Sequence, residues 1–197
     1  MRPVASIVEG DGEVQAVPVL LRRMNEWQPG DIYVNPLTPI KVRRDRFLNR
    51  DEEFRKYVLL AAAKCGAEGW LLILLDADDD CPATLGADVL GRVRAVTTHP
   101  RVSVVVANRE YEAWFIAAAA SLDGQRGFLR GTDHVADPER PRDAKGWVSQ
   151  HIPGGRYRET TDQPAFTALF DLQQAFDDCR SFRKLCSEWA RHTGVGM

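Results

Sequence analysis

The sequence predicts an α/β protein with a small parallel β-sheet, helices on both of its faces, and a C-terminal helical extension. Segments 3–8, 70–75 and 101–107 have the length and apolar content of buried strands. Patterns typical of helices separate them, and strands that alternate with helices indicate right-handed crossovers and a parallel sheet. Acidic residues follow each of these three strands. Because parallel strands end at the same edge of a sheet, we expect these acids to lie near one another.

The helices begin and end at residues that commonly stop or cap them. Pro18 is tolerated only in a first turn, so the first helix is expected to begin later than Glu13. Asn49 or Asp51 is expected to cap the second helix. Pro82 favours the first position of the third. In order, the expected elements are strand 3–8, helix 13–27, strand 37–42, helix 51–65, strand 70–75, helix 82–99, strand 101–107 and a helix from 108 to about 121.

We expect a single domain that consists of an α/β core over 1–122 and an extension over 123–197. The first part of the extension, 123–161, is polar and rich in Gly and Pro, with a short helix around 143–151. The segment 163–192 is expected to be helical, with a break at 179–181. Its apolar positions would pack on the core or on a partner.

Composition excludes several classes of protein. The chain has 197 residues and a formal net charge of −2, so any nucleic-acid binding must come from a local basic patch. No apolar run approaches the roughly 18 residues of a membrane span, and a signal peptide is not expected. The four cysteines form no CxxC pair. We therefore expect a reduced, cytoplasmic protein that does not contact membranes.

The strongest functional signal is the acidic run that follows the strand 70–75. Asp76 and Asp78 are two residues apart, so in an extended chain both side chains point the same way. Two convergent carboxylates repel each other unless a cation lies between them, and oxygen ligands suit Mg²⁺ or Mn²⁺. Asp79 and Asp80 are better explained as caps of the helix that begins at Pro82.

Weaker candidates follow the other strands. Glu9 ends the first strand, where a structural role is hard to find for it, while Glu13 could simply favour a helix start. Glu110 and Glu112 could likewise be ordinary acids of a first helical turn. Lys145 is a lone cation of the kind that assists a phosphate, although such residues more often lie on the surface.

A basic run over 41–50 is the first candidate for contact with a nucleic-acid backbone. The alternative is an ordinary solvated face. The proposed contacts are Lys41, Arg43, Arg44 and Arg46.

Several of these motifs resemble the Toprim domain, the metal-dependent module of topoisomerases, bacterial primases and overcoming-lysogenization-defect (OLD) type nucleases. Val8-Glu9-Gly10-Asp11-Gly12-Glu13 is similar to the opening of the OLD-type branch, and Asp76-Ala77-Asp78 to its Asp-x-Asp. The resemblance implies that Glu9 and Glu13 serve metal ions. Asn108-Arg109-Glu110 is a looser match, with Asn in the place of Ser, and Lys145 could stand for the late lysine of that branch.

The fuller pattern also resembles a family of small, stand-alone, uncharacterised Toprim-like prokaryotic proteins. The shared segments include Asp76-Ala77-Asp78-Asp79-Asp80-Cys81-Pro82, the run from Asn108 to Phe115, and Thr161-Asp162-Gln163. This resemblance implies a partner, because members often lie beside an ATPase, as in anti-phage defence modules.

These observations predict a Mg²⁺- or Mn²⁺-dependent nuclease that hydrolyses phosphodiester bonds in DNA or RNA with one or two ions. Glu9, Asp76 and Asp78 would hold one ion, and Glu13 and Glu110 would help to place a second. Lys145 or an arginine of the run 41–50 would offset charge on the phosphate. Two alternatives stay open: another metal-dependent phosphotransfer enzyme (a phosphatase or nucleotidyl transferase), and a non-catalytic partner or sensor subunit of an ATPase.

Overall fold

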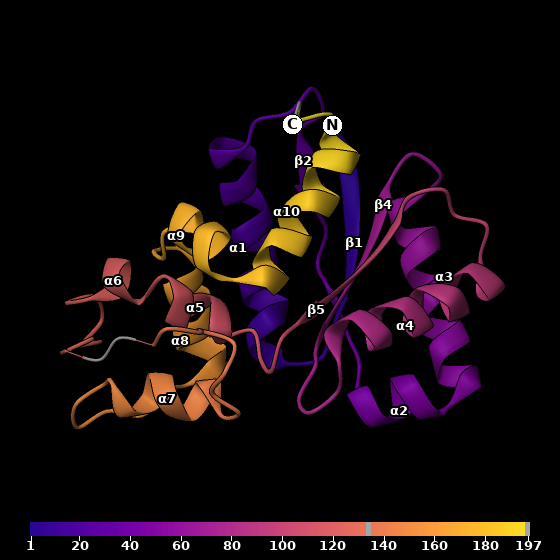
Figure 1. Ribbon diagram of the computed structural model, residues 1–197. Helices are drawn as coiled ribbons and strands as arrows, with labels where there is room; N and C mark the ends of the chain where they lie inside the picture. Colours follow the sequence, from indigo (N-terminus) through magenta and orange to yellow (C-terminus); the bar gives the residue numbers. More distant parts are fainter. Residues whose placement is uncertain (133–134, 196–197) are drawn as a thin grey trace.

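The computed structural model describes residues 1–132 and 135–195, and it confirms the α/β fold class (Figure 1). A parallel sheet lies at the centre, in the order β2-β1-β4-β5, with β3 also paired to β1. β5 therefore forms one edge of the sheet. The strands are β1 (Arg2–Val8), β2 (Val34–Pro36), β3 (Ile40–Lys41), β4 (Trp70–Asp76) and β5 (Val102–Ala107).

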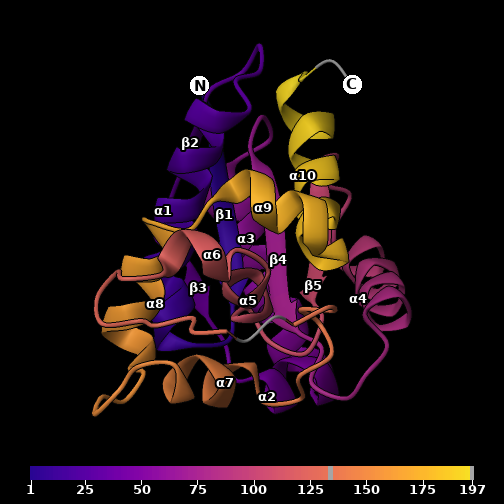
Figure 2. The ribbon, with the colours of Figure 1, turned by 60° about the vertical axis from the view of Figure 1, so that its left-hand side comes forward.

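Helices cover both faces of the sheet, as Figures 1 and 2 show. One face carries α1 (Asp11–Trp27), α5 (Ala113–Ala117), α6 (Ala119–Leu122), α7 (Ala144–Gln150), α8 (Glu159–Thr167), α9 (Leu172–Asp178) and α10 (Arg180–Thr193). The other carries α2 (Arg44–Asn49), α3 (Asp51–Cys65) and α4 (Pro82–Val96). Alternate residues of β4 enter the two cores. Trp70, Leu72 and Leu74 pack on the first face, and Leu71, Ile73 and Leu75 on the second. Burial on both sides explains the unbroken apolar run.

The first helix begins earlier than expected. α1 starts at Asp11, and the Glu13 carboxylate accepts a hydrogen bond from the backbone N–H of Gly10. Pro18 lies inside α1, where it lacks the N–H that would bond one turn back. The buried apolar face of α1 offsets this loss. The prediction of a later start was therefore wrong.

Three other local expectations need correction. The expected strand 37–42 is replaced by the short strands β2 and β3, because Pro36 and Pro39 interrupt the pattern. The basic run forms its own helix, α2, so α3 is capped by Arg50 without a side-chain hydrogen bond. The expected helix 108–121 begins only at Ala113 and is divided into α5 and α6.

The C-terminal part of the chain packs on the same face of the sheet as α1 (Figure 2). The rings of Trp70 and Trp189 lie 6.4 Å apart, and the Ser103 hydroxyl donates to Glu188 over 2.6 Å. Residues 133–134 and 196–197 of the expected extension lie outside the described residues. None of the described helices combines the length and apolar content needed to cross a membrane.

Candidate functional site

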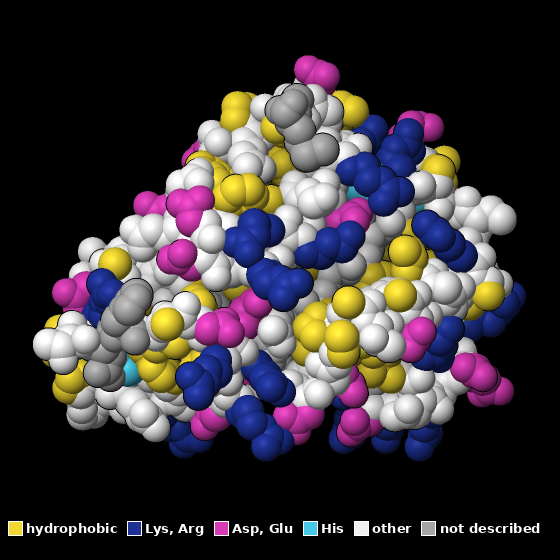
Figure 3. Space-filling view, viewed as in Figure 1, with side chains coloured by type: hydrophobic (Ala, Val, Ile, Leu, Met, Phe, Trp, Pro, Cys, Tyr) yellow, Lys and Arg dark blue, Asp and Glu magenta, His cyan; other side chains and the backbone are white. Residues whose placement is uncertain are grey.

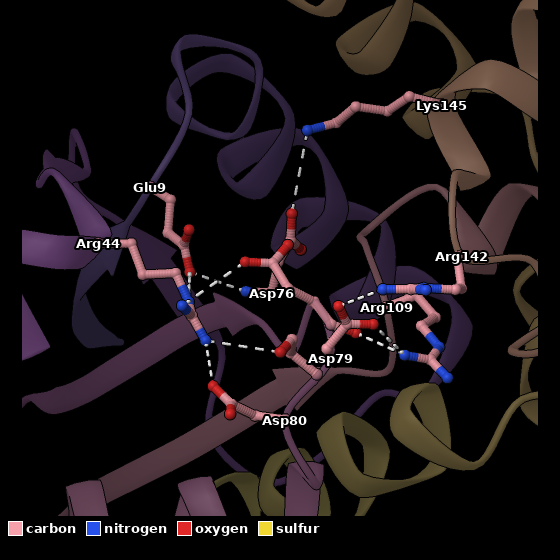
Figure 4. A network of polar contacts seen from close by, with 10 residues as sticks. Glu9, Arg44, Asp76, Asp79, Asp80, Arg109, Arg142 and Lys145 are labelled. Atoms are coloured by element: carbon pink, nitrogen blue, oxygen red, sulfur yellow. Dashed lines mark hydrogen bonds and ion pairs between the residues drawn. The ribbon is translucent and has the colours of Figure 1, made fainter.

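Glu9 and Asp76 meet at the carboxyl edge of the sheet (Figure 4). The backbone N–H of Asp76 donates to Glu9 Oε1 over 2.9 Å, which continues the pairing of β1 with β4 beyond the last strand residues. Asp76 Oδ1 accepts from the backbone N–H of Tyr111 over 2.9 Å. Asp76 is only 7 % exposed. The ends of β1, β4 and β5 thus contribute to one buried site, as the sequence predicts.

Lys145 enters this site from the start of α7. The Asp143 side chain caps α7 by accepting from the backbone N–H of Gly146. Lys145 Nζ lies 4.0 Å from Asp76 Oδ2, 3.9 Å from Glu110 Oε1 and 3.6 Å from Glu159 Oε1. The backbone N–H of Lys145 also donates to Glu110 Oε2 over 2.9 Å. The structure therefore brings together Lys145, Glu110 and Asp76, the first two of which were weak candidates in the sequence.

Glu112 is a component of the site that sequence reasoning assigned only to a helix start. Its side chain is fully buried. Glu112 Oε1 accepts from the hydroxyl of Tyr157 over 2.8 Å and from Gln163 Nε2 over 3.2 Å. Oε2 has no hydrogen-bond partner among the described residues. In the sequence, the one indication that Glu112 belongs to the site is its position two residues after Glu110. Its burial depends on Tyr157 and Gln163, which are distant in sequence.

Burial raises the pKa values of these acids. It raises the pKa of Glu9 to about 7, although the hydrogen bond from Asp76 and the charge of Arg44 oppose it. Burial raises the pKa of Glu112 to about 8. The pKa of Asp76 is well above its usual value because of burial and the neighbouring carboxylates, and burial also raises the pKa of Glu13. The site therefore holds more carboxyl groups than its own cations neutralise.

The charge of Lys145 shows the same excess of acid. Burial alone disfavours the ammonium. Four surrounding carboxylates outweigh that effect and raise the pKa of Lys145: Glu112, Asp76, Glu159 and Glu110.

Arg44 lies beside Glu9, on the side of Glu9 that is away from Lys145 (Figure 4). Its guanidinium is 3.7 Å from Glu9 Oε1, 3.5 Å from Asp78 Oδ2 and 2.6 Å from Asp80 Oδ2, and the side chain is only 20 % exposed. The other expected nucleic-acid contacts divide into two groups. Lys41 and Arg46 form ion pairs with Asp11 and Glu53. Arg43 is exposed, and its side chain makes no hydrogen bond or ion pair with the described part of the chain.

The acidic run after β4 is organised differently from the expectation. The extended backbone ends at Asp76, and Asp78 has a left-handed backbone with φ of 50°. Asp76 therefore faces Lys145, whereas Asp78 is 58 % exposed and faces Arg44. The expectation that both side chains point the same way assumed a strand that does not continue.

Asp79 and Asp80 do not cap α4. The cap residue is Cys81, and it makes no side-chain capping hydrogen bond. Asp79 instead forms ion pairs with Arg109 and Arg142, and Asp80 pairs with Arg44 (Figure 4). The carboxylates of Asp79 and Asp80 therefore bind arginines that are distant in sequence. They do not accept hydrogen bonds from the backbone N–H groups of the first turn of α4.

Comparison with known families identifies the chain. The model of a family described as a domain of unknown function, DUF4276, matches residues 8–189. The chain belongs to the DUF4276 family. No curated protein and no solved structure matches it. The DUF4276 match begins one residue before Glu9 and includes Lys145, Tyr157 and Gln163, so the family unit contains both the acids and the residues that cover them.

The acids of this DUF4276 protein fit a divalent cation by their chemistry. In the described ranges, no group of three or more His, Cys, Asp or Glu side chains already stands in a metal-binding arrangement. However, Glu112 Oε2 is buried without a hydrogen bond, and Asp76 Oδ2 has only the ammonium of Lys145, 4.0 Å away. Carboxylate oxygens with spare acceptor capacity are the ligands that Mg²⁺ and Mn²⁺ prefer.

Proposed function

We propose that this DUF4276 protein is a metal-dependent nuclease that hydrolyses phosphodiester bonds at the carboxyl edge of its sheet. The observation that carries the proposal is the burial of Asp76 among Glu9, Glu13 and Glu112, whose charges raise its pKa together with burial. A site with this excess of carboxylate is stabilised by a bound cation. The Toprim-like order of Glu9, Asp76 and Glu110 along the chain supports the same activity.

The residues divide into two roles. Glu9 and Asp76 are the proposed ligands of one Mg²⁺ or Mn²⁺, and Glu13 and Glu110 are the proposed ligands of a second. Asp78 faces Arg44 and is not counted among the ligands. When bound, such a cation supplies the Lewis acidity that activates water and offsets charge on the phosphate. Lys145 holds its ammonium beside the acids, where it can neutralise a phosphate oxygen, and the carboxylates around it keep it protonated.

The test is cleavage of supercoiled plasmid, single-stranded DNA and RNA by the purified protein in Mg²⁺ or Mn²⁺. We expect Glu9→Gln and Asp76→Asn to lose cleavage by roughly 10²-fold or more, because each removes a charged ligand. Asp88→Asn, on an exposed position of α4, is the matched control and should cleave normally. If the wild-type protein cleaves none of these substrates in either metal, the proposal fails.

Metal binding can be tested separately from cleavage. Because Glu9 and Asp76 have raised pKa values, a cation must displace protons from them at low pH. We therefore expect Mn²⁺ to raise the thermal midpoint more at pH 8 than at pH 5.5. Glu9→Gln and Asp76→Asn should reduce this shift, while Asp88→Asn should keep it. A shift that is equal at both pH values, or equal in all variants, would contradict the assignment of these acids.

We also propose a cytoplasmic location and an ATPase partner encoded nearby. Cys65, Cys81, Cys179 and Cys186 are free thiols, which suits a reducing compartment. The partner follows from the resemblance to Toprim-like proteins of defence modules. Repeating the cleavage assay with the neighbouring ATPase and ATP tests it, and a rate that stays the same would argue against this partner.

A further inference from the structure

A cavity of about 370 Å³ lies at the open edge of the sheet, between the first turns of α4 and α10. We call it the β5 cavity. Pro82, Val104 and Val106 form its apolar wall, Arg180 and Lys184 form its basic wall, and Cys81 lies beside Pro82. Figure 1 shows β5 between α4 and α10, with no further strand outside it. The cavity is thus in a different place from the acids around Lys145.

The edge strand gives this cavity backbone donors and acceptors. The carbonyls of Arg101 and Ala107 accept hydrogen bonds from Leu71 and Ala77, next to the ends of β4. Because residues of a strand alternate in direction, Val104 and Val106 turn their N–H and C=O groups away from β4 and toward the open edge. A ligand in the cavity can therefore combine apolar contact with hydrogen bonding to main-chain groups.

The basic wall has positive charge that the protein does not neutralise. Arg180 is exposed, and its side chain makes no hydrogen bond or ion pair with the described residues. Lys184 pairs with Glu188, but Arg191 shares that carboxylate. Figure 3 shows Lys and Arg side chains gathered over α10, beside a hydrophobic patch. The cations of α10 are Arg180, Arg183, Lys184 and Arg191, and its acid is Glu188.

One further acid lies in the wall. The Glu139 carboxylate accepts from the backbone N–H of Ser181 over 2.8 Å and from Cys179 Sγ over 3.1 Å. The Glu139 carboxylate therefore stabilises the first turn of α10. Among the described residues that line the cavity, Arg180 is therefore a cation without an ion pair, in contrast to Arg44, which is surrounded by carboxylates.

The lining of the β5 cavity is adjacent in the chain to residues that contact the acidic run after β4. Asn108 lines the cavity, and the next residue, Arg109, donates to the backbone carbonyl of Asp78 over 2.9 Å and pairs with Asp79. This contact places the lining of the cavity near the acids that follow β4. The position suits a substrate strand that extends beyond the bond being cut.

We propose that the β5 cavity binds one nucleotide of a single nucleic-acid strand, next to the scissile phosphate. The base packs on Pro82 and the two valines, and Arg180 and Lys184 contact the phosphate. A cavity of this size suits one nucleotide rather than a duplex, and a basic groove with apolar contacts is typical of single-strand binding. This assignment rests on the proposed nuclease function for its class of ligand.

Cys81 allows a direct test. It is the exposed cysteine of the four, while Cys65, Cys179 and Cys186 are buried. The polar groups of Thr84 and Ala83 in the first turn of α4 lower the pKa of its thiol, which favours reaction with a disulfide reagent such as DTNB. We expect oligothymidylate, in EDTA and at low salt, to slow the labelling of Cys81 by roughly 10-fold. Cys81→Ser should abolish the rapid phase and thereby identify the thiol.

Charge reversal locates the strand. Arg180→Glu combined with Lys184→Glu should raise the oligonucleotide concentration needed to protect Cys81 by roughly 10- to 100-fold. Arg55→Glu, on an exposed position of α3, is the matched control and should leave protection unchanged. A parallel titration with oligouridylate distinguishes DNA from RNA as the preferred strand.

The outcomes separate this proposal from the nuclease. The labelling is measured in EDTA, where metal-dependent cleavage does not occur. Asp76 does not line the β5 cavity, so Asp76→Asn should retain full protection of Cys81. Protection without cleavage in any metal would contradict the nuclease but support the cavity assignment. If neither oligonucleotide slows labelling, the assignment is overturned. It is also overturned if labelling slows with protein concentration alone, which would indicate a second copy of the chain in the cavity.

Discussion

A Lys145→Met protein is expected to lose cleavage by roughly 10²- to 10³-fold. It is also expected to lose unfolding free energy on the order of 2–4 kcal/mol at pH 8. Lys145 Nζ lies within 4.0 Å of oxygens of Asp76, Glu110 and Glu159. Its removal leaves these carboxylates without their internal counter-ion. Because the buried acids take up protons as the pH falls, the loss of stability should be smaller at pH 5.

Urea unfolding at both pH values and the plasmid-cleavage assay measure these two effects. Lys145→Arg keeps the charge and should retain most of the stability. Lys56→Met, on the exposed face of α3, controls for the loss of a surface ammonium. If Lys145→Met unfolds at the same urea concentration as wild type and cleaves at the same rate, Lys145 has neither role.

Glu112→Gln is expected to stabilise the metal-free protein at pH 8.5 and to change little near pH 4.5. Burial raises the pKa of Glu112 from 4.5 to about 8. Below pH 4.5 the carboxyl is protonated in the folded and unfolded states alike. As the pH rises from 4.5 to 8, the unfolded chain releases this proton and the folded chain retains it, so folding becomes less favourable. The full difference is on the order of 3–5 kcal/mol.

The glutamine variant preserves the neighbouring contacts, which makes the comparison clean. A Gln side-chain oxygen can still accept from the hydroxyl of Tyr157 and from Gln163. Urea unfolding from pH 4.5 to 8.5 should show a flatter pH dependence in this variant than in wild type. Glu52→Gln, on an exposed position of α3, should leave the curve unchanged. Parallel curves for Glu112→Gln and wild type would show that Glu112 does not retain a proton on folding.

The strands could be predicted because their patterns are local. Trp70–Asp76 is apolar along almost its whole length, and this is what burial on both faces of a parallel sheet requires. The position of β1 beside β4 explains why Glu9 and Asp76 meet. The order of the strands is not a local property, since it depends on which crossovers the helices make. The open edge at β5 therefore became visible only in the structure.

The roles of single acids were harder to predict because their partners are distant in sequence. Asp79 resembles a helix cap, but Arg109 and Arg142 reach it across the fold. Glu112 resembles an ordinary acid of a first turn, yet Tyr157 and Gln163 bury it. For the same reason the basic run over 41–50 overstated the free charge of that region, because Arg44 is enclosed by three carboxylates.

Lys145, Tyr157 and Gln163 are synthesised after Asp76 and Glu112, the acids that they contact. A nascent chain that ends near residue 122 has these acids but not the ammonium that faces them or the groups that bury Glu112. α8, which contains Gln163 and packs on α1, also lies beyond residue 122, and α10, which packs on β5, is later still. A product of termination near residue 122 therefore lacks groups that complete the candidate site. For the proposed nuclease, this order of synthesis delays completion of the candidate site until Gln163 has been made.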